Sequence, residues 1–265
     1  MIFLNLFLYF IIYSVIGWIY ESILCSITGK KLVNRGFLNG PLCPIYGSGA
    51  MVILLVFYGQ DTALLPLFLS SMILTSVVEY ITSVLLEVFF NAKWWDYTDR
   101  PFNIHGRVYL TGALVFATLS VVLIRYIHPF MISIIDGLSS NTVILLSISI
   151  GLIFLYDIYI TVTHVLQLKT RLSTARQEIN RLLKEGAIRM EELKVLLQDR
   201  IEDTIIYTDK VKALFEKGRY QNRRLFKAFP QLKPMKNSDI FQKLKNSIIE
   251  QRKKYDDKKN QRNNI

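Results

Sequence analysis

The sequence predicts an all-α, polytopic helical membrane protein with about five transmembrane helices and a C-terminal cytoplasmic helical, coiled-coil tail. Three observations predict this fold class. Long apolar stretches fill residues 1–165, charged residues gather in residues 166–265, and apolar residues at the start of the tail follow a heptad spacing. A helix needs about 20 apolar residues to cross the hydrocarbon core of a bilayer, so stretches of this length indicate membrane spans.

Five apolar stretches approach that length, at about residues 2–27, 42–59, 63–90, 108–128 and 141–165. The second is short and begins after Gly40 and Pro41, so we expect it to start as a loop or a broken helix. The first has neither the basic start nor the cleavage site of a signal peptide and is expected to be a retained helix. Residues 1–165 are thus predicted to form the transmembrane domain.

Charge is distributed unevenly along the chain. Residues 1–165 hold 7 basic and 8 acidic residues, whereas residues 166–265 hold 25 and 13, which gives net charges of −1 and +12. Cytoplasmic loops carry an excess of Lys and Arg. With five spans, the two loops that hold most of the basic residues, after the first and after the third span, lie on the same side of the membrane as the tail. We therefore expect a multi-pass protein of the cytoplasmic (cell) membrane, with its N-terminus outside and its C-terminus in the cytoplasm. The basic tail suits anionic lipid, and no nucleic-acid partner is expected.

The tail is predicted to consist of two parts. Apolar residues spaced three and four apart from Val165 to Leu182 form a heptad seam that Gly186 interrupts. A second apolar stripe runs from Met190 to Ile205, so residues 166–230 are predicted to form a helical hairpin or coiled coil. Residues 231–265 are predicted to be a basic tail with a short helix at about 238–252 and a disordered end.

Four carboxylates lie inside the apolar stretches: Glu21, Glu79, Glu87 and Asp157. A charge at that depth is costly, so these residues are expected to face the protein interior, a wet cavity or a partner. Helical spacing places Glu79 and Glu87 on one face of the third span. Together the acids favour the cytoplasmic half, which predicts a polar cleft open to the cytosol.

Two interpretations of these carboxylates stay open. In the first they form a cation or proton site, or an anchor for a polar substrate. In the second they pair structurally, Glu87 with Arg107 or Lys93, and Asp157 with a nearby hydroxyl or with His164.

The two predicted cytoplasmic connectors differ from ordinary loops. Residues 31–47 are rich in glycine and proline, and irregular backbone at membrane depth must be covered by protein or line a cavity. Residues 93–107 carry Trp94 and Trp95, which suit the membrane interface; alternatively, polar residues beside them close over the cleft. The candidate binding cleft comprises Glu21, Asn34, Arg35, Asn39, Tyr46, Glu79, Glu87, Asp96, His105, Arg107 and Asp157.

The sequence lacks several common nucleotide-binding and hydrolase motifs. It contains no phosphate-binding loop of the G-x-x-x-x-G-K-[ST] type, no H-E-x-x-H and no G-x-S-x-G. Two cysteines, Cys25 and Cys43, are too few for a disulfide framework or a thiolate metal cluster. No catalytic residue, metal site or cofactor is therefore predicted.

Four segments of the membrane part resemble one family. They read YSVIGWIYES (residues 13–22), NRGFLNGPLCPIYG (34–47), EYITS (79–83) and WWDY (94–97), and the tail segment RRLFKAFP (223–230) is also similar. These segments resemble the type IV ABC-transporter permeases, or CmpB-like integral membrane proteins. The resemblance implies a transport role beside a separate ATPase subunit. It points to Glu21, Asn34, Arg35, Gly36, Asn39, Gly40, Pro41, Tyr46, Glu79, Trp95 and Asp96.

Three functions remain open from the sequence. The first is an ABC permease-like membrane subunit whose cleft handles a polar or cationic solute, working as a homo-oligomer because five spans are few for a transport path. The second is a membrane-embedded enzyme acting on a lipid or lipid-linked substrate, with Glu79, Asp96 or His105 as acid or base and Arg35 and Arg107 holding phosphate. The third is a membrane scaffold or regulator whose tail binds anionic lipid or a partner.

Overall fold

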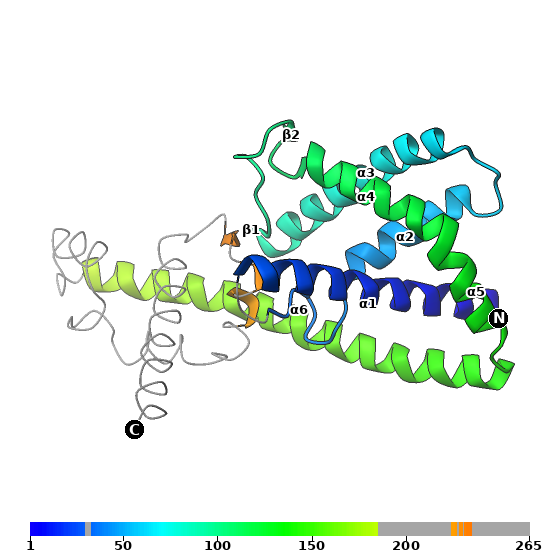
Figure 1. The fold of residues 1–265 in the computed structure, drawn as a ribbon. Helices are drawn as coiled ribbons and strands as arrows, with labels where there is room; N and C mark the ends of the chain where they lie inside the picture. The colour runs from blue at the N-terminus through cyan, green and yellow to red at the C-terminus, as the bar shows by residue number, and fades with distance from the viewer. Residues whose placement is uncertain (30–32, 185–223, 227, 230, 235–265) are drawn as a thin grey trace, which may run out of the picture. The chain divides into compact units, whose positions relative to one another are not determined.

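The structure, a computed structural model, describes residues 1–29, 33–184, 224–226, 228–229 and 231–234 (Figure 1). The predictions made for the second apolar stripe, the helical hairpin and the short helix at 238–252 lie outside these residues. The chain divides into two compact units, residues 1–89 with 93–161, and residues 90–92 with the residues from 162 onward.

Helices make up most of the first unit. They are α1 (Ile2–Gly29), α2 (Pro44–Phe57), α3 (Leu64–Phe90), α4 (Leu110–Val122), α5 (His128–Asp136) and the first part of α6 (Ser140–Lys184), with a π-helical turn, η1 (Leu123–Ile127), between α4 and α5. The strands β1 (Ala92–Lys93), β2 (Asn103–Ile104), β3 (Val108–Tyr109) and β4 (Lys233–Pro234) have two residues each. The all-α fold class predicted from the sequence is confirmed.

Four helical stretches are long and apolar enough to cross a membrane: Ile2–Ile27, Leu64–Phe90, Leu110–Asp136 and Ser140–Arg171. The remaining predicted stretch, the second at about residues 42–59, forms α2, which has only 14 residues and spans roughly 21 Å of a core that is about 30 Å thick. Residues 33–43 precede it without helical structure. The second stretch thus begins as irregular chain, in agreement with the glycine and proline that introduce it.

The fourth span is longer than its sequence suggested. It runs from Leu110 to Asp136 through the π-helical turn, although we expected it to end near residue 128. Pro129 explains the turn, because proline has no N–H to bond the carbonyl four residues earlier and its ring crowds that carbonyl. The Arg125 guanidinium, at the same place, donates a hydrogen bond to the Thr62 carbonyl in the α2–α3 connector.

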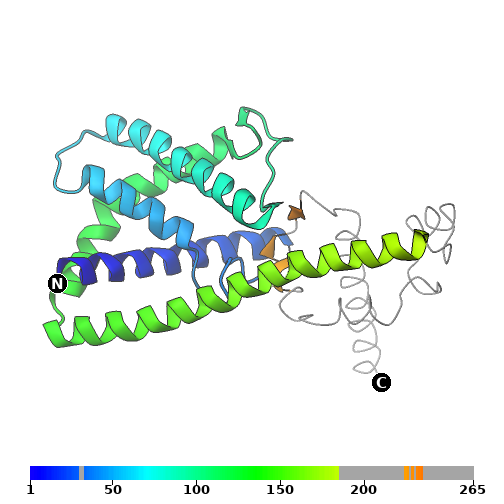
Figure 2. The same ribbon diagram turned by 180° about the vertical axis from the view of Figure 1, so that it is seen from behind.

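The first unit packs around α1. In Figures 1 and 2, α1 and the first part of α6 run alongside each other, α2 lies against α1, and α3 and α4 stand at an angle to them. One buried cluster joins α1 to α2, α3 and the fourth span through Leu8, Ile53, Leu67 and Leu123. A second cluster, with Ile11 and Leu38, packs the α1–α2 connector between α1 and α6.

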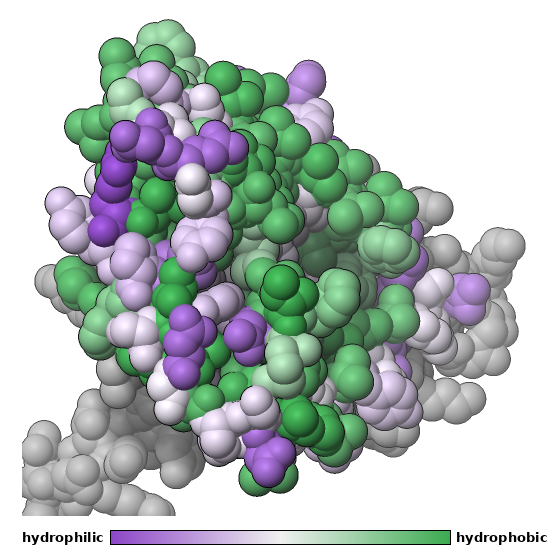
Figure 3. Space-filling model, turned by 90° about the vertical axis from the view of Figure 1, so that its right-hand side faces the viewer, coloured by the Kyte–Doolittle hydropathy of each residue, from purple (hydrophilic) through white to green (hydrophobic). Residues whose placement is uncertain are grey.

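The surface of this unit is largely apolar. Figure 3 shows hydrophobic side chains over much of one face, with a hollow among them. On α3, a stripe of exposed residues recurs every three or four positions, as a lipid-facing stripe does: Ile73, Val77, Ile81, Leu85 and Val88. The polar residues of α3 therefore occupy its other side, which faces α1, α2 and α4.

The second unit is small among the described residues. The helix α6 continues to Lys184, past the expected end of the span at residue 165. Val165 and Leu168, the first two positions of the heptad seam, are buried, and so are Leu225, Phe226 and Phe229 of the RRLFKAFP segment. The coiled coil itself stays a prediction.

Candidate functional site

Glu21, in the C-terminal half of α1, is held by three neighbours. Its Oε1 accepts a hydrogen bond from the Tyr46 hydroxyl at 2.8 Å, and its Oε2 lies 3.7 Å from Nε of Arg35. The thiol of Cys25, one helical turn away, points to the same carboxylate at 3.8 Å. The predicted residues Glu21, Arg35 and Tyr46 are thus brought together from α1, the connector and α2.

Close packing of α1 on α2 brings Tyr46 next to Glu21. A Cβ atom on Gly17 would overlap the root of the Tyr46 side chain, and one on Gly47 would lie 2.6 Å from the Phe10 carbonyl oxygen. Glycine at both positions lets the two helices approach until Tyr46 reaches Glu21.

Asn34 organises the connector between α1 and α2. Its Oδ1 accepts hydrogen bonds from Trp18 Nε1 on α1 at 2.7 Å and from the Gly36 N–H at 3.2 Å. Its Nδ2 donates to the Asn39 carbonyl at 3.2 Å. One amide side chain therefore satisfies connector backbone groups that would otherwise be exposed to an apolar environment.

Asp157 on α6 holds the same connector from the other side. Its carboxylate accepts hydrogen bonds from the Asn39 N–H at 3.0 Å, from Asn39 Nδ2 at 2.8 Å and from the Gly40 N–H at 2.7 Å. The Thr161 hydroxyl donates to it at 3.2 Å. The predicted pairing of Asp157 with a nearby hydroxyl is confirmed, and the main role of this acid in the structure is to bind the connector.

Glu87 and Arg107 form the second charged contact. Glu87 Oε2 lies 2.6 Å from Arg107 NH1 and forms an ion pair with it. The geometry of this contact is not that of a hydrogen bond. Arg107 also donates to the Ser83 hydroxyl at 3.1 Å and lies over the Tyr80 ring, 5.6 Å from its centroid. The predicted structural pair of Glu87 with Arg107 is confirmed.

Asp96 and His105 belong to the folded loop between α3 and α4. Asp96 Oδ1 accepts the Thr98 N–H at 3.2 Å and its hydroxyl at 2.9 Å, so it stabilises its own turn. Nδ1 of the exposed His105 pairs with the Tyr80 hydroxyl at 3.1 Å. In the short hairpin of β2 and β3, Asn103 pairs with Tyr109 and Ile104 with Val108. Neither Asp96 nor His105 lines the cavity described next.

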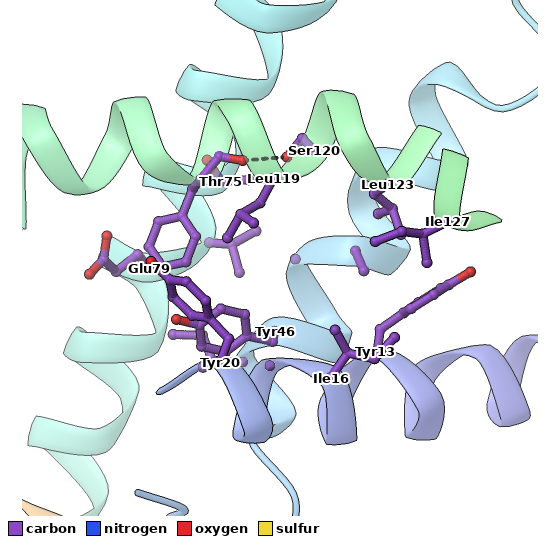
Figure 4. Close-up of a pocket in the computed structure, with 16 residues that line it drawn as sticks. Tyr13, Ile16, Tyr20, Tyr46, Thr75, Glu79, Leu119, Ser120, Leu123 and Ile127 are labelled. Carbon is purple, nitrogen blue, oxygen red and sulfur yellow. Dashed lines mark hydrogen bonds between the residues drawn. The ribbon is translucent and has the colours of Figure 1, made fainter. Parts of the chain in front are cut away.

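A cavity of about 120 Å³ lies among α1, α2, α3 and α4, and most of its lining is aliphatic or aromatic. Figure 4 shows Glu79, Tyr20 and Tyr46 toward one end and Leu123 and Ile127 toward the other. Of the predicted cleft residues, Tyr46 and Glu79 line this cavity. Its apolar character differs from the polar cleft that we expected.

Glu79 is the acid in the cavity wall. Its side of α3 is turned away from the lipid-facing stripe, and the residue is only 6% exposed. Its Oε2 is buried and has no hydrogen-bond partner among the described residues. Glu21 and Glu87 each lie against an arginine, whereas no such ion pair to Glu79 occurs in the described part of the chain.

Tyr97, in the α3–α4 loop, lies near these acids and was not among the predicted cleft residues. Burial raises the pKa of its phenol, and the charges of Glu79 and Glu21 raise that pKa further, partly offset by Arg35. Its hydroxyl thus stays protonated. Tyr20 and Phe116, which line the cavity, were also missed, because aromatic residues inside apolar helices give no signal that separates cavity from lipid.

The arrangement can bind a group through a carboxylate and aromatic rings. No cluster of three or more metal-ligating side chains occurs among the described residues. The site provides a buried carboxylate and several aromatic rings, beside connectors that are held by hydrogen bonds.

These features define a polytopic helical membrane protein with a cavity among its helices and an acid in the cavity wall. The family model described as "Putative ABC-transporter type IV" matches residues 8–162. The chain belongs to this family, and the resemblance drawn from its segments is confirmed. Comparison with curated proteins found no match, and comparison with solved structures found none either.

Proposed function

We propose that this chain is the membrane subunit of a transport system, that it works with a separate ATP-hydrolysing subunit, and that the cavity among α1–α4 is its solute site. Family membership supports a transporter-like membrane subunit. The sequence has no phosphate-binding loop of the G-x-x-x-x-G-K-[ST] type, which is why the proposal includes a second protein.

The observation that carries the solute site is the buried, unpartnered Oε2 of Glu79. A carboxylate placed in an apolar environment without a cation costs several kcal/mol. Such a cost is usual where the charge serves a ligand or an ion. The other three acids of the spans have protein partners, so Glu79 is the one left for a solute.

We propose further that the acidic end of the cavity faces the cytosol. Arg35 and Arg107, close to Glu21 and Glu87, lie at the connectors that the excess of basic residues favours on the cytoplasmic side. A test is labelling of single cysteines in intact cells with a membrane-impermeant maleimide. Asp61→Cys, in the α2–α3 connector, should react, and Arg100→Cys, in the α3–α4 connector, should react only after permeabilisation. The reverse pattern contradicts this orientation.

The transport role is tested on the chain isolated from its native membranes in a mild detergent. We expect an ATP-hydrolysing protein to be retained in a fixed ratio, and ATP hydrolysis by the reconstituted complex to fall at least tenfold with Glu79→Gln. Asp61→Asn makes the same chemical change at an exposed position outside the cavity and should leave hydrolysis unchanged.

Two results contradict the proposal. One is isolation of the chain without any ATP-hydrolysing protein. The other is a Glu79→Gln complex that folds and hydrolyses ATP as fast as the Asp61→Asn control.

A further inference from the structure

We infer that the cavity binds a small organic cation of the trimethylammonium type, with the rings of Tyr20, Tyr46 and Phe116 around its methyl groups and Glu79 as its counter-charge. This inference rests on the proposed solute site but names the chemistry of the ligand. It replaces the general polar solute expected from the sequence with a cation that has an apolar surface.

The three rings line the cavity and contact one another. The centroids of Tyr20 and Tyr46 are 6.1 Å apart, with their planes at 58°, and those of Tyr46 and Phe116 are 5.5 Å apart at 64°. The rings come from α1, α2 and α4, and all three line the cavity. Aromatic rings that line a cavity bind alkylated ammonium groups, whose charge is spread over their methyl groups.

Glu79 supplies the charge that this ligand requires. It lies beside Tyr20 and Tyr46 at one end of the cavity (Figure 4). Its Oε2 lacks a hydrogen-bond donor among the described residues. A trimethylammonium group has no N–H to donate, so it binds through charge and through the ring faces. A metal ion or a primary amine would instead need several oxygen ligands.

The cavity has the right size and lining for such a group. Its volume is about 120 Å³, close to the roughly 150 Å³ of an engineered cavity that admits benzene. Beyond the acidic end the wall consists of side chains such as Leu119, Leu123 and Ile127. An apolar wall of this kind favours methyl groups over a hydrated inorganic cation.

The test compares two probes on the full chain in lipid nanodiscs by isothermal titration calorimetry. The probes are choline and 3,3-dimethyl-1-butanol, its uncharged carbon isostere. We expect choline to bind at least tenfold more tightly than the isostere. Equal binding of the two, or no binding of choline, overturns the inference, and this comparison does not depend on any variant.

Variants then assign the binding to this site. Glu79→Gln should remove the preference for choline over its isostere. Phe116→Leu, which removes a ring and keeps an apolar side chain, should weaken choline binding roughly tenfold, whereas Phe130→Leu, the same change at an exposed ring outside the cavity, should change it less than twofold. Unchanged binding in both Glu79→Gln and Phe116→Leu overturns the assignment to this cavity.

Failure of this inference and failure of the proposed function are distinguishable. If choline does not bind but the ATP-hydrolysing complex responds to Glu79→Gln, the ligand class is wrong and the transport role stands. If choline binds but no ATP-hydrolysing protein is retained, the ligand class stands and the transport role is wrong.

Discussion

Asp157 on α6 and Asn39 in the α1–α2 connector are joined by two hydrogen bonds. The carboxylate Oδ1 accepts from the Asn39 main-chain N–H at 3.0 Å and from its side-chain Nδ2 at 2.8 Å. The adjacent Gly40 N–H donates to Oδ2 at 2.7 Å. Through these contacts, one acid satisfies the backbone of an irregular segment that is packed between two helices.

Replacing Asp157 should therefore destabilise the chain. Asp157→Ala leaves two main-chain N–H groups without an acceptor and should lower the free energy of unfolding by about 3 kcal/mol. Asp157→Asn keeps one acceptor oxygen and should cost roughly half as much. Thermal unfolding in detergent measures both.

The exposed Asp136 at the end of α5 provides the control for this change, because Asp136→Asn should alter stability by less than about 0.5 kcal/mol. An Asp157→Ala chain as stable as that control would contradict the role of Asp157 in holding the connector.

The contact between Glu87 and Arg107 predicts a compensating pair of substitutions. Arg107→Ala leaves Glu87 unpaired in an apolar span and should cost about 3–5 kcal/mol. Adding Glu87→Gln removes the unpaired charge and should recover at least half of that loss. A double-mutant cycle on thermal stability makes the measurement, and strictly additive losses would argue against a stabilising ion pair.

The contact between Gly17 and Tyr46 predicts that a larger residue at position 17 destabilises the chain, and Gly49 provides a matched control. Gly17→Ala places a methyl group against the root of the Tyr46 side chain and should cost about 1–3 kcal/mol. Gly49→Ala adds the same methyl group to the neighbouring helix α2 where no atom lies within 4 Å, so it should stabilise the chain by up to about 1 kcal/mol. If both substitutions have the same sign, the close packing of Gly17 on Tyr46 is wrong.

Cys43 predicts a pH-dependent reactivity. Burial, and next the negative charge of Glu21, raise the pKa of the Cys43 thiol to about 12, although Arg35 acts in the opposite direction. The thiolate is the reactive form, so below pH 12 the alkylation rate should rise about tenfold per pH unit and stay slow at pH 8.

This rate is measured with iodoacetamide on a Cys25→Ser chain, where Cys43 is the remaining thiol. The same chain unfolded in detergent gives the rate of an exposed cysteine. Equal rates at pH 8 for the folded and unfolded chains would show that the thiol is neither buried nor raised in pKa.

The sequence predicted the parts of the site that depend on charge in an apolar segment. The acids were expected to face away from lipid, because an unpaired charge there is costly, and Arg107 or Lys93 was the expected structural partner of Glu87. The connector was expected to be covered by protein or to line a cavity, because its backbone is irregular, and Asn34 and Asp157 bond to it.

The other features of the site and the fold depend on tertiary contacts, which leave no pattern in the local sequence. Tyr20 and Phe116 sit in apolar helices, where an aromatic residue suits lipid, core and cavity equally well. Asp96 accepts hydrogen bonds from Thr98 two residues away, a local turn that competes with any role in a cleft. The extension of the fourth span through Pro129 required a π-helical turn, which sequence periodicity does not reveal.

The most direct test of the central claim uses Thr75, which lines the cavity one helical turn before Glu79. In the Cys25→Ser background, the reaction rates of Thr75→Cys are measured with a trimethylammonium thiosulfonate and with a sulfonate-bearing thiosulfonate. Each rate is divided by that reagent's rate with a free thiol in solution. The account predicts at least a tenfold preference for the cationic reagent, lost when Glu79→Gln is added. Equal corrected rates for the two reagents with Glu79 in place, or a preference that persists after Glu79→Gln is added, would contradict it.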